Sequence, residues 1–444
     1  MGRVFQLNHA FDELRPRKTT FGRRITELRH NDGYAGVSDF ATNSSDSMGM
    51  KPPLPPGLAE FAAGVLRQNL AAEGFAVEFV DSLLSAARRA GASDIHAQPV
   101  DAGESLSILW RLNGVLHPVV TIPRGKQNVI ARLKVLADLL TYKTESPQEG
   151  RIRCGDDGVE MRLSTFPTIH GEKAVIRLFI ADRVHHTIDQ LGLPPEIVAD
   201  LADALAATSG IVLVAGPAGS GKTTTLYACL RHLASQSPRR GLSSLEDPVE
   251  AVIPGVAQSQ VKAASGFTYT TALKSLLRQD PEVIMVGEIR DRETADMVFQ
   301  ASLSGHLVLT SFHAGSSAEA ISRLTDMGIE PFVLRSGLRT ILTQRLLRRR
   351  CSCNGTQPEC PTCQGTGHSG RIVIAELGRP DAEETRRPIL ERREAREIGA
   401  ALEAAGMIPL RKRAAQAVSQ KLTSVEEVQR ILGASADTNP SGGV

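Results

Sequence analysis

The sequence is poor in the features that mark several common classes of protein. Aromatic residues make up 4% of its 444 residues, with a single tryptophan, and the formal net charge is only +2. Nucleic-acid-binding proteins usually combine a basic surface with aromatic side chains on which bases stack, so we expect no direct nucleic-acid partner. Six cysteines in a chain of this length do not indicate a disulfide scaffold.

Long apolar runs are also missing. No stretch approaches the roughly 18 consecutive apolar residues that a membrane-spanning helix needs. The opening segment Met1–His9 lacks the apolar core of a secretion signal. Hydrophobic residues at 41% and charged residues at 23% are ordinary for globular proteins, and the length favours several folding units. We therefore expect a multidomain globular protein of the cytoplasm.

Composition and periodicity divide the chain into five segments. Residues 1–57 are rich in Gly, Ser, Asp, Asn and Pro in their second half, which predicts a flexible segment and linker, with a docked irregular arm as the alternative. Helical and strand patterns then alternate. The predicted units are an N-terminal α/β domain (58–183), a P-loop domain with a mostly parallel sheet (184–346), a cysteine-containing and helical region (347–433) and a disordered tail (434–444).

Individual elements follow from the same patterns. The predicted helices are Val77–Ala87, Val129–Leu140, Thr224–Arg231 and the charged stretch Ala382–Arg396, and the predicted strands are Ser105–Leu112, Val159–Ser164, Ala174–Ile180, Ile211–Ala215 and Val283–Val286. The basic triplet at 348–350 is more typical of a solvated face than of a nucleic-acid site.

A phosphate-binding loop lies between an apolar strand and a helix. The run Gly216-Pro217-Ala218-Gly219-Ser220-Gly221-Lys222-Thr223, followed by Thr224, fits G-x-x-x-x-G-K-[ST]. Such glycines let backbone N–H groups point at phosphate oxygens, the lysine reaches the β- and γ-phosphates, and the Thr223 hydroxyl holds Mg²⁺. A glycine-rich turn that binds nothing is the alternative. The strand and helix on either side favour a nucleoside triphosphate with Mg²⁺.

Acidic and histidine side chains follow other predicted strands. Glu288 comes shortly after the strand Val283–Val286. In a P-loop protein, an acidic residue at such a strand end helps to bind Mg²⁺ and to orient the attacking water. Glu246 and Glu250 flank a proline turn, which is either part of this site or an exposed acidic loop. His306 and His313 bracket a further apolar strand. They are either satisfied core residues or sensors of the γ-phosphate.

The order of these motifs resembles the ATPases of type II secretion and type IV pilus assembly. The family names the corresponding stretches the Walker A, Asp, Walker B and His boxes. In this sequence they are the P-loop, Glu246–Glu250, Leu277–Pro281 running into Gly287–Asp291, and Ala301–His306. The resemblance extends to Ala92–His96 in the first domain and to 423–428 near the other end, and covers about Phe75 to Gly433. It implies a PAS-like N-terminal domain and a RecA-like P-loop domain.

The same resemblance implies how the subunits assemble and how the nucleotide is enclosed. The family forms homohexameric rings in which basic side chains of the N-terminal domain close on the γ-phosphate, and Arg162 and Arg177 fall at the matching positions. A guanidinium delivered in the closed state stabilises charge on the transferred phosphoryl group. Solvent-facing arginines beside strands are the alternative. Glu246, Glu250 and Glu288 are candidates for the water and Mg²⁺, with their division of roles left open.

The chain departs from the family pattern at two places. Thr271 and Lys274 stand where arginines are common, and Ala314-Gly315-Ser316 replaces Thr-Asn-Asp after the second histidine. Because threonine and lysine do not reproduce the fork contacts of arginine, the first departure bears on contacts between subunits. The N-terminal module of many type II enzymes is not recognisable in residues 1–57.

Four cysteines form two close pairs. Cys351 and Cys353, with Cys360 and Cys363, resemble the tetracysteine zinc element of the secretion and assembly ATPases, which the retraction ATPases generally lack. Four thiolates satisfy tetrahedral Zn²⁺, although the first pair is one residue shorter than C-x-x-C. Four reduced, unligated thiols are the alternative.

Together these features predict an ATP-hydrolysing hexamer that is peripheral to the inner membrane. By resemblance, its partners are an inner-membrane platform protein and, indirectly, pilin-like subunits. Three alternatives remain: a retraction or DNA-uptake ATPase of the same superfamily, a nucleotide-binding scaffold with little turnover, and a nucleic-acid-binding ring.

Overall fold

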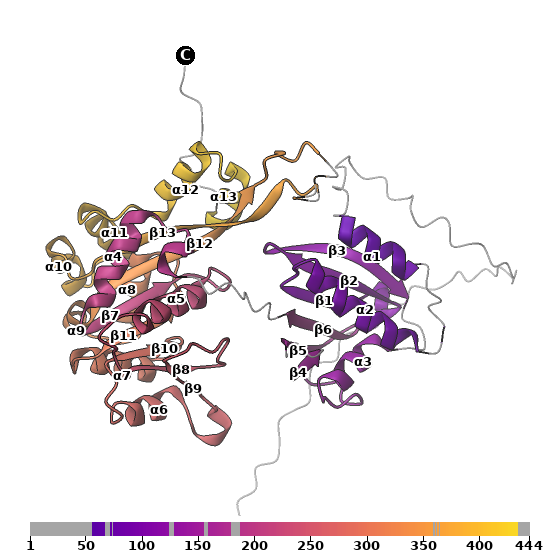
Figure 1. Ribbon diagram of the computed structural model, residues 1–444, viewed down its shortest axis with the longest axis horizontal. Coiled ribbons are helices and arrows are strands. Elements are labelled where there is room, and N and C mark those ends of the chain that lie inside the picture. Colours follow the sequence, from indigo (N-terminus) through magenta and orange to yellow (C-terminus); the bar gives the residue numbers. More distant parts are fainter. Residues whose placement is uncertain are drawn as a thin grey trace, which may run out of the picture. The chain divides into compact units, whose positions relative to one another are not determined.

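A computed structural model of the chain describes residues 56–66, 72, 74–123, 128–154, 159–178, 187–357, 360, 362–363 and 365–433. The segment predicted to be flexible, residues 1–57, lies outside the described residues except for its last two, which begin a helix, and so does the predicted tail, residues 434–444. The described chain forms two domains, each built on its own sheet (Figure 1). Among the described residues, no helix combines the length and the apolar character that crossing a membrane requires.

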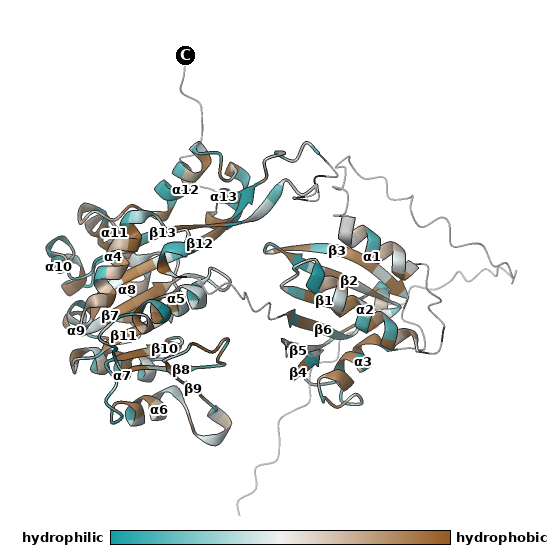
Figure 2. Cartoon of the chain, in the orientation of Figure 1, coloured by the Kyte–Doolittle hydropathy of each residue, from teal (hydrophilic) through white to brown (hydrophobic). Residues whose placement is uncertain are grey.

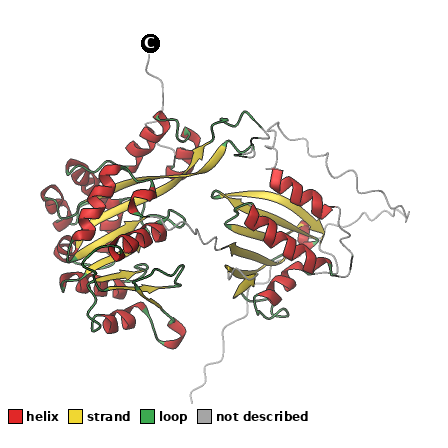
Figure 3. Ribbon diagram, viewed as in Figure 1, coloured by secondary structure: helices red, strands yellow, loops and turns green. Residues whose placement is uncertain are grey.

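The first domain is a six-stranded antiparallel sheet with helices packed on one face (Figure 3). The strand order is β3-β2-β1-β6-β5-β4. Its elements are α1 (Pro56–Leu66), α2 (Phe75–Arg89), β1 (Asp94–Val100), the 3₁₀ helix η1 (Asp101–Gly103), β2 (Ser105–Leu112), β3 (Val115–Pro123), α3 (Val129–Leu136), β4 (Gln148–Cys154), β5 (Val159–Thr168) and β6 (Gly171–Leu178).

Alternation along the strands decides which face of this sheet is covered. In β2 the side chains of Leu106, Ile108 and Trp110 are buried, and they join one core with Phe79 and Leu83 of α2. Neighbouring residues in a strand point to opposite faces, so the other face of the sheet is left for polar side chains. The mixed α/β domain predicted from these patterns is confirmed.

Two helix predictions need correction. The predicted helix Val129–Leu140 ends at Leu136, because Asp138 adopts a left-handed conformation (φ 56°) that a right-handed helix cannot continue through. The single charged helix predicted over 382–396 is in fact covered by two helices, α10 (Glu383–Leu390) and the start of α11 (Ala395–Ala404). Arg392 lies between them at φ 53°, which breaks the helical path.

The second domain is a seven-stranded sheet in the order β13-β12-β7-β11-β10-β8-β9, parallel throughout except for β13. Its strands are β7 (Gly210–Ala215), β8 (Leu242–Glu246), β9 (Ala257–Gln260), β10 (Val283–Val286), β11 (Leu307–Phe312), β12 (Leu338–Arg350) and β13 (His368–Gly378). Its helices are α4 (Pro195–Ala206), α5 (Lys222–Ala234), α6 (Tyr269–Leu276), α7 (Arg292–Leu303), α8 (Ser317–Asp326), α9 (Pro331–Gly337), α10 (Glu383–Leu390), α11 (Ala395–Ala404), α12 (Leu410–Ser419) and α13 (Val425–Leu432), with 3₁₀ helices η2 (Ile188–Leu191) and η3 (Ala263–Ser265).

Helices cover both faces of this sheet. Ile211 and Leu213 of β7 belong to the core made with α6 to α9, whereas Val212 and Val214 belong to the core made with α4 and α5. A strand that packs on both sides is buried at every position, as β7 and β11 are, and both strands are mostly hydrophobic (Figure 2). The predicted parallel P-loop domain is confirmed.

The division predicted at residue 346 falls inside β12, which continues to Arg350, so the sheet extends past the predicted boundary. β13 returns along β12 and the four cysteines lie between these two strands. Helices α12 and α13 pack on this pair. Burial opposes ionisation of Glu427 in α13, but bonds from Arg430 and Arg348 outweigh it and lower the pKa of Glu427 to about 2. Arg348 of the basic triplet is therefore a structural partner.

Breaking the buried ion pair of the first domain should be strongly destabilising. The Lys134 ammonium is fully buried, 2.7 Å from the Glu172 carboxylate and 2.9 Å from the Lys143 carbonyl oxygen. Glu172→Gln keeps the shape but leaves the ammonium without its counter-charge, and we expect a loss of about 3–5 kcal/mol. The fluorescence of Trp110, the single tryptophan, which is buried in this core, reports the transition in a denaturant titration.

Asp81→Asn is the matched control. Asp81 pairs with Arg132 at 4.0 Å in an exposed position, and its loss should cost less than about 1 kcal/mol. Equal midpoints for the two variants would contradict a special role for the buried pair.

Candidate nucleotide-binding and catalytic site

Parallel strands bring the predicted motifs to one edge of the second sheet. The P-loop follows β7, Glu246 ends β8, Glu288 follows β10 and His313 follows β11. β7, β11, β10 and β8 are neighbours and parallel, so their carboxyl ends meet. Residues separated by up to about a hundred positions in the chain thus lie along one edge of the sheet, and open α/β sheets bind ligands at the carboxyl ends of their strands.

The P-loop backbone needs glycine at its first position. Gly216 has φ 153°, and a Cβ there would lie 2.3 Å from Ser220 Oγ and 2.8 Å from the carbonyl oxygen of Gln344. Gly221, at φ 91°, precedes the first residue of α5. Thr223, the predicted Mg²⁺ ligand, is the second residue of that helix and is half-buried. The amino end of α5 therefore opens onto the loop, as anion binding requires.

Lys222 lies over the loop. Its Nζ donates to the carbonyl oxygens of Gly216 at 2.9 Å and Pro217 at 3.0 Å. Burial lowers the pKa of Lys222, and the nearby Glu288 carboxylate opposes that shift. The ammonium is held beside the position at which the motif places the β- and γ-phosphates.

Gln344 of β12 fixes the P-loop from outside the motif. Its Nε2 donates to the Ser220 carbonyl oxygen at 2.8 Å, and its Oε1 accepts from Thr225 Oγ1 at 2.9 Å. Sequence reasoning missed this residue. More than a hundred positions separate the partners, and a glutamine within a strand of mixed composition carries no local signal of such a contact.

Glu288 lies at the centre of a charged cluster. Arg290 donates to Glu288 Oε1 through Nε at 2.7 Å and through a second nitrogen, and lies 3.4 Å from Asp247 Oδ2. His313 Nε2 is 3.5 Å from Glu288 Oε2. Burial, and then the Lys222 charge, lower the pKa of His313, so its ring is neutral at neutral pH. Sequence reasoning included Arg290 in a motif without assigning it this role.

The acidic turn after β8 is divided between core and surface. Glu246 is only 3% exposed, so the interpretation of an exposed loop is wrong for this residue. Asp247 and Glu250 are exposed. The turn thus offers two accessible carboxylates close to a buried one.

The structure does not bring His306 to this edge. His306 precedes β11, and its carbonyl oxygen accepts from the N–H of Gly210 at the start of β7. His313 follows the other end of the six-residue strand. At about 3.3 Å per residue, the two histidines are separated by about 20 Å.

In the first domain, Arg162 and Arg177 are direct cross-strand neighbours on β5 and β6. They belong to a row on the face of the sheet opposite the core. Asp94 lies between two arginines of this row: its carboxylate is 3.1 Å from Arg177 and 3.3 Å from Arg111. The row runs across five strands as Arg111, Asp94, Arg177, Arg162 and Arg151.

The departures from the family pattern have local structural roles. Thr271 and Thr268 cap the amino end of α6 through a reciprocal pair of bonds, and Lys274 is exposed on the same helix. Ser316 caps α8 by accepting from the N–H of Glu319 at 3.1 Å. Serine and aspartate are both good N-caps, so the replacement preserves the start of the helix.

The four predicted cysteine ligands come together. Their sulfurs all lie within 4.8 Å of one another, with Cys351 and Cys360 3.8 Å apart and Cys353 and Cys363 3.3 Å apart. A tetrahedron with Zn–S bonds of about 2.3 Å has sulfurs about 3.8 Å apart, so the donor set fits zinc. In the metal-free cluster the backbone N–H groups of Cys363 and Thr362 lower the pKa of Cys360 to about 6, whereas burial raises the pKa of Cys363 to about 12.

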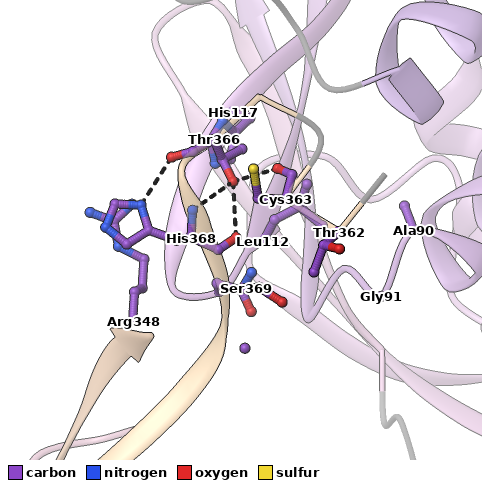
Figure 4. A pocket seen from close by; sticks show the side chains of 12 residues that line it. Ala90, Gly91, Leu112, His117, Arg348, Thr362, Cys363, Thr366, His368 and Ser369 are labelled. Atoms are coloured by element: carbon purple, nitrogen blue, oxygen red, sulfur yellow. Dashed lines mark hydrogen bonds between the residues drawn. The ribbon is translucent and has the colours of Figure 1, made fainter. Parts of the chain in front are cut away.

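Bonds within the adjoining turn hold this cluster on the sheet. Thr366 Oγ1 donates to the Cys363 carbonyl oxygen at 2.6 Å and lies 3.1 Å from the carbonyl oxygen of His368, the first residue of β13 (Figure 4). The cysteine cluster is therefore tied to the strand that continues into the second sheet.

Comparison with known proteins identifies the family of this chain. The model of the type II/IV secretion system protein family matches residues 69–430. The chain belongs to this family. The type II secretion system protein HxcR of Pseudomonas aeruginosa is 40% identical over 366 residues, which cover 80% of this chain and 77% of the relative.

Other relatives extend the comparison. The type IV pilus assembly ATPase PilB of Thermus thermophilus is 38% identical over 385 residues, or 80% of this chain and 43% of PilB. The ATPase DotB of Legionella pneumophila has a similar fold, with a TM-score of 0.61 at 23% identity over 80% of this chain and 95% of DotB. As a member of this family of secretion ATPases, the chain is an ATP-hydrolysing enzyme.

Proposed function

We propose that the chain is a cytoplasmic, homohexameric motor that hydrolyses ATP to drive type II secretion or type IV pilus assembly. The observation that carries the proposal is the placement of Glu288 among Lys222, Arg290 and His313 beside the P-loop. Such a cluster can hold phosphate, retain Mg²⁺ and orient a water molecule for attack.

The residues divide this work by position. Backbone N–H groups at the start of α5 and the Lys222 ammonium bind the phosphates, and the Thr223 hydroxyl holds Mg²⁺. Mg²⁺, when bound, neutralises charge on the β- and γ-phosphate oxygens. Glu288 accepts a proton from the attacking water, and the exposed Glu250 carboxylate assists from the neighbouring turn. His313, neutral at neutral pH, lies beside Glu288 and is placed to respond to the γ-phosphate.

The first domain supplies the positive charge that acts on the γ-phosphate. Arg177 and Arg162 close on the γ-phosphate as the ring cycles, with Asp94 fixing the guanidinium of Arg177. Closure of the domain over each nucleotide is the motion that the ring passes to an inner-membrane platform protein and, through it, to pilin-like subunits.

The tetracysteine element favours secretion or pilus assembly over retraction, since retraction ATPases generally lack it. The scaffold alternative was motivated by Thr271, Lys274 and the segment 314–316. Because Thr271 and Ser316 cap helices, these departures do not indicate a lost catalytic function.

Glu288→Gln tests the catalytic assignment. The amide cannot accept the proton, so we expect phosphate release to fall about a hundredfold or more while the affinity for ATP stays within about threefold. Glu293→Gln, an exposed position in the first turn of α7, is the control and should keep the wild-type rate. Equal and negligible rates in all three proteins would instead favour a nucleotide-binding scaffold.

The arginines have a separate test. Arg177→Ala and Arg162→Ala should each lower the turnover number by about a thousandfold, and lysine at either position should rescue poorly, because it lacks the guanidinium fork. Arg89→Ala, which removes an exposed contact with Ser85 at the end of α2, should leave turnover unchanged. Wild-type phosphate release in both arginine variants would contradict the proposed closure.

We also propose that the four cysteines hold one structural zinc ion. Elemental analysis should find about one zinc per chain, and Cys360→Ser or Cys363→Ser should remove most of it. Cys229→Ala is the control, because Cys229 is buried among apolar residues of α5 and its neighbours. Full zinc content in the two serine variants would rule out this site.

A further inference from the structure

Glu246 is built into the core at the end of β8. Both of its carboxylate oxygens are engaged: Oε2 accepts from the Tyr227 hydroxyl, and Oε1 accepts from Ser244 Oγ at 2.5 Å and Gln258 Nε2 at 3.1 Å. Tyr227, like Glu246, is buried, with an exposed fraction of 4%. A buried carboxylate with three donors has a fixed orientation and little capacity to bind a moving water molecule.

Two of these donors continue to the turn that carries Glu250. The Tyr227 oxygen accepts from the backbone N–H groups of Glu250 at 2.9 Å and Ala251 at 3.3 Å. Gln258 Nε2 donates to the Ala251 carbonyl oxygen at 3.0 Å, and its Oε1 accepts from the Ile253 N–H at 2.6 Å. Four backbone groups between Glu250 and Ile253 are thereby held by two side chains that meet at one carboxylate.

The negative charge of Glu246 determines which group donates in each of two hydrogen-bond relays, one through Tyr227 and one through Gln258. A carboxylate only accepts hydrogen bonds, so the single hydrogen of the Tyr227 hydroxyl is committed to it, and the oxygen lone pairs of Tyr227 are left for the two N–H groups. Burial, together with the bond to Glu246, raises the pKa of Tyr227, which keeps the hydroxyl protonated. The amide of Gln258 is oriented in the same way, with its NH₂ toward Glu246 and its oxygen toward Ile253.

We propose that Glu246 is a positioning residue, which acts through Tyr227 and Gln258 to fix the backbone from which the exposed Glu250 carboxylate reaches Mg²⁺ or water. This inference rests on the role of Glu250 in the proposed function. Of the two candidates in the acidic turn, only Glu250 then takes part in the chemistry. A displacement of about 1 Å in such a group can lower the rate about a hundredfold, so the hydrogen bonds that hold the Glu250 backbone in place protect the rate.

Tyr227→Phe tests the relay by removing one oxygen atom while keeping the buried ring. We expect the turnover number for ATP to fall 10- to 100-fold, with the dissociation constant for ATP within threefold of wild type. The turnover number of Glu250→Gln should fall by a similar factor. The double variant should lose little beyond the lower of the two single variants, because both remove the same function. Ser243→Ala removes a buried hydroxyl from the same strand, one residue from Ser244 and on the other face of the sheet, and should keep the wild-type rate.

The possible outcomes distinguish a failure of the positioning role of Glu246 from a failure of the catalytic role of Glu250. Wild-type turnover in Tyr227→Phe combined with impaired turnover in Glu250→Gln would overturn the positioning role and leave the proposed function standing. A double variant whose loss equals the product of the single losses would overturn it too. Wild-type turnover in Glu250→Gln would remove the premise. Circular dichroism melting of each variant checks folding, and if Tyr227→Phe fails to fold, Gln258→Glu tests the second relay by the same measurements.

Discussion

The parallel register of four neighbouring strands is the constraint on which this site depends. β8, β10, β11 and β7 end at one edge of the sheet, and each is followed within a few residues by one of the proposed site residues. Helices on both faces make this arrangement rigid, because every position of β7 and β11 is buried. The chemistry at the edge is therefore held by apolar packing in the two cores beneath it.

Polar contacts between distant segments complete the geometry that the strands begin. Gln344 links β12 to the P-loop and the helix after it, and Arg345, the next residue, donates to the carbonyl oxygen of Gly315 at 2.9 Å. The same strand reaches Glu427 through Arg348 and ends beside Cys351. β12 thus connects the phosphate loop, the turn after His313 and the cysteine cluster within one continuous element.

Much of this could be predicted from local patterns. The P-loop, the strand Val283–Val286 and the grouping of four cysteines all depend on residues close together in sequence, and the structure places them as expected. Helix ends were less predictable. Asp138 and Arg392 adopt left-handed conformations that their residue types do not demand, so Val129–Leu140 and 382–396 appeared as longer helices than they are.

The sequence alone determined the family and predicted the phosphate-binding loop and the acidic and histidine candidates, because these are carried by residue types at short, fixed spacings. Tertiary structure decided which candidates meet. It buried Glu246 and exposed Glu250 although both belong to one turn, it placed His306 at the opposite end of β11 from His313, and it brought Gln344 to the P-loop. These outcomes depend on strand direction, burial and contacts across more than a hundred residues. Spacing along the chain does not encode such relations, since the sheet forms them only when the whole domain is packed.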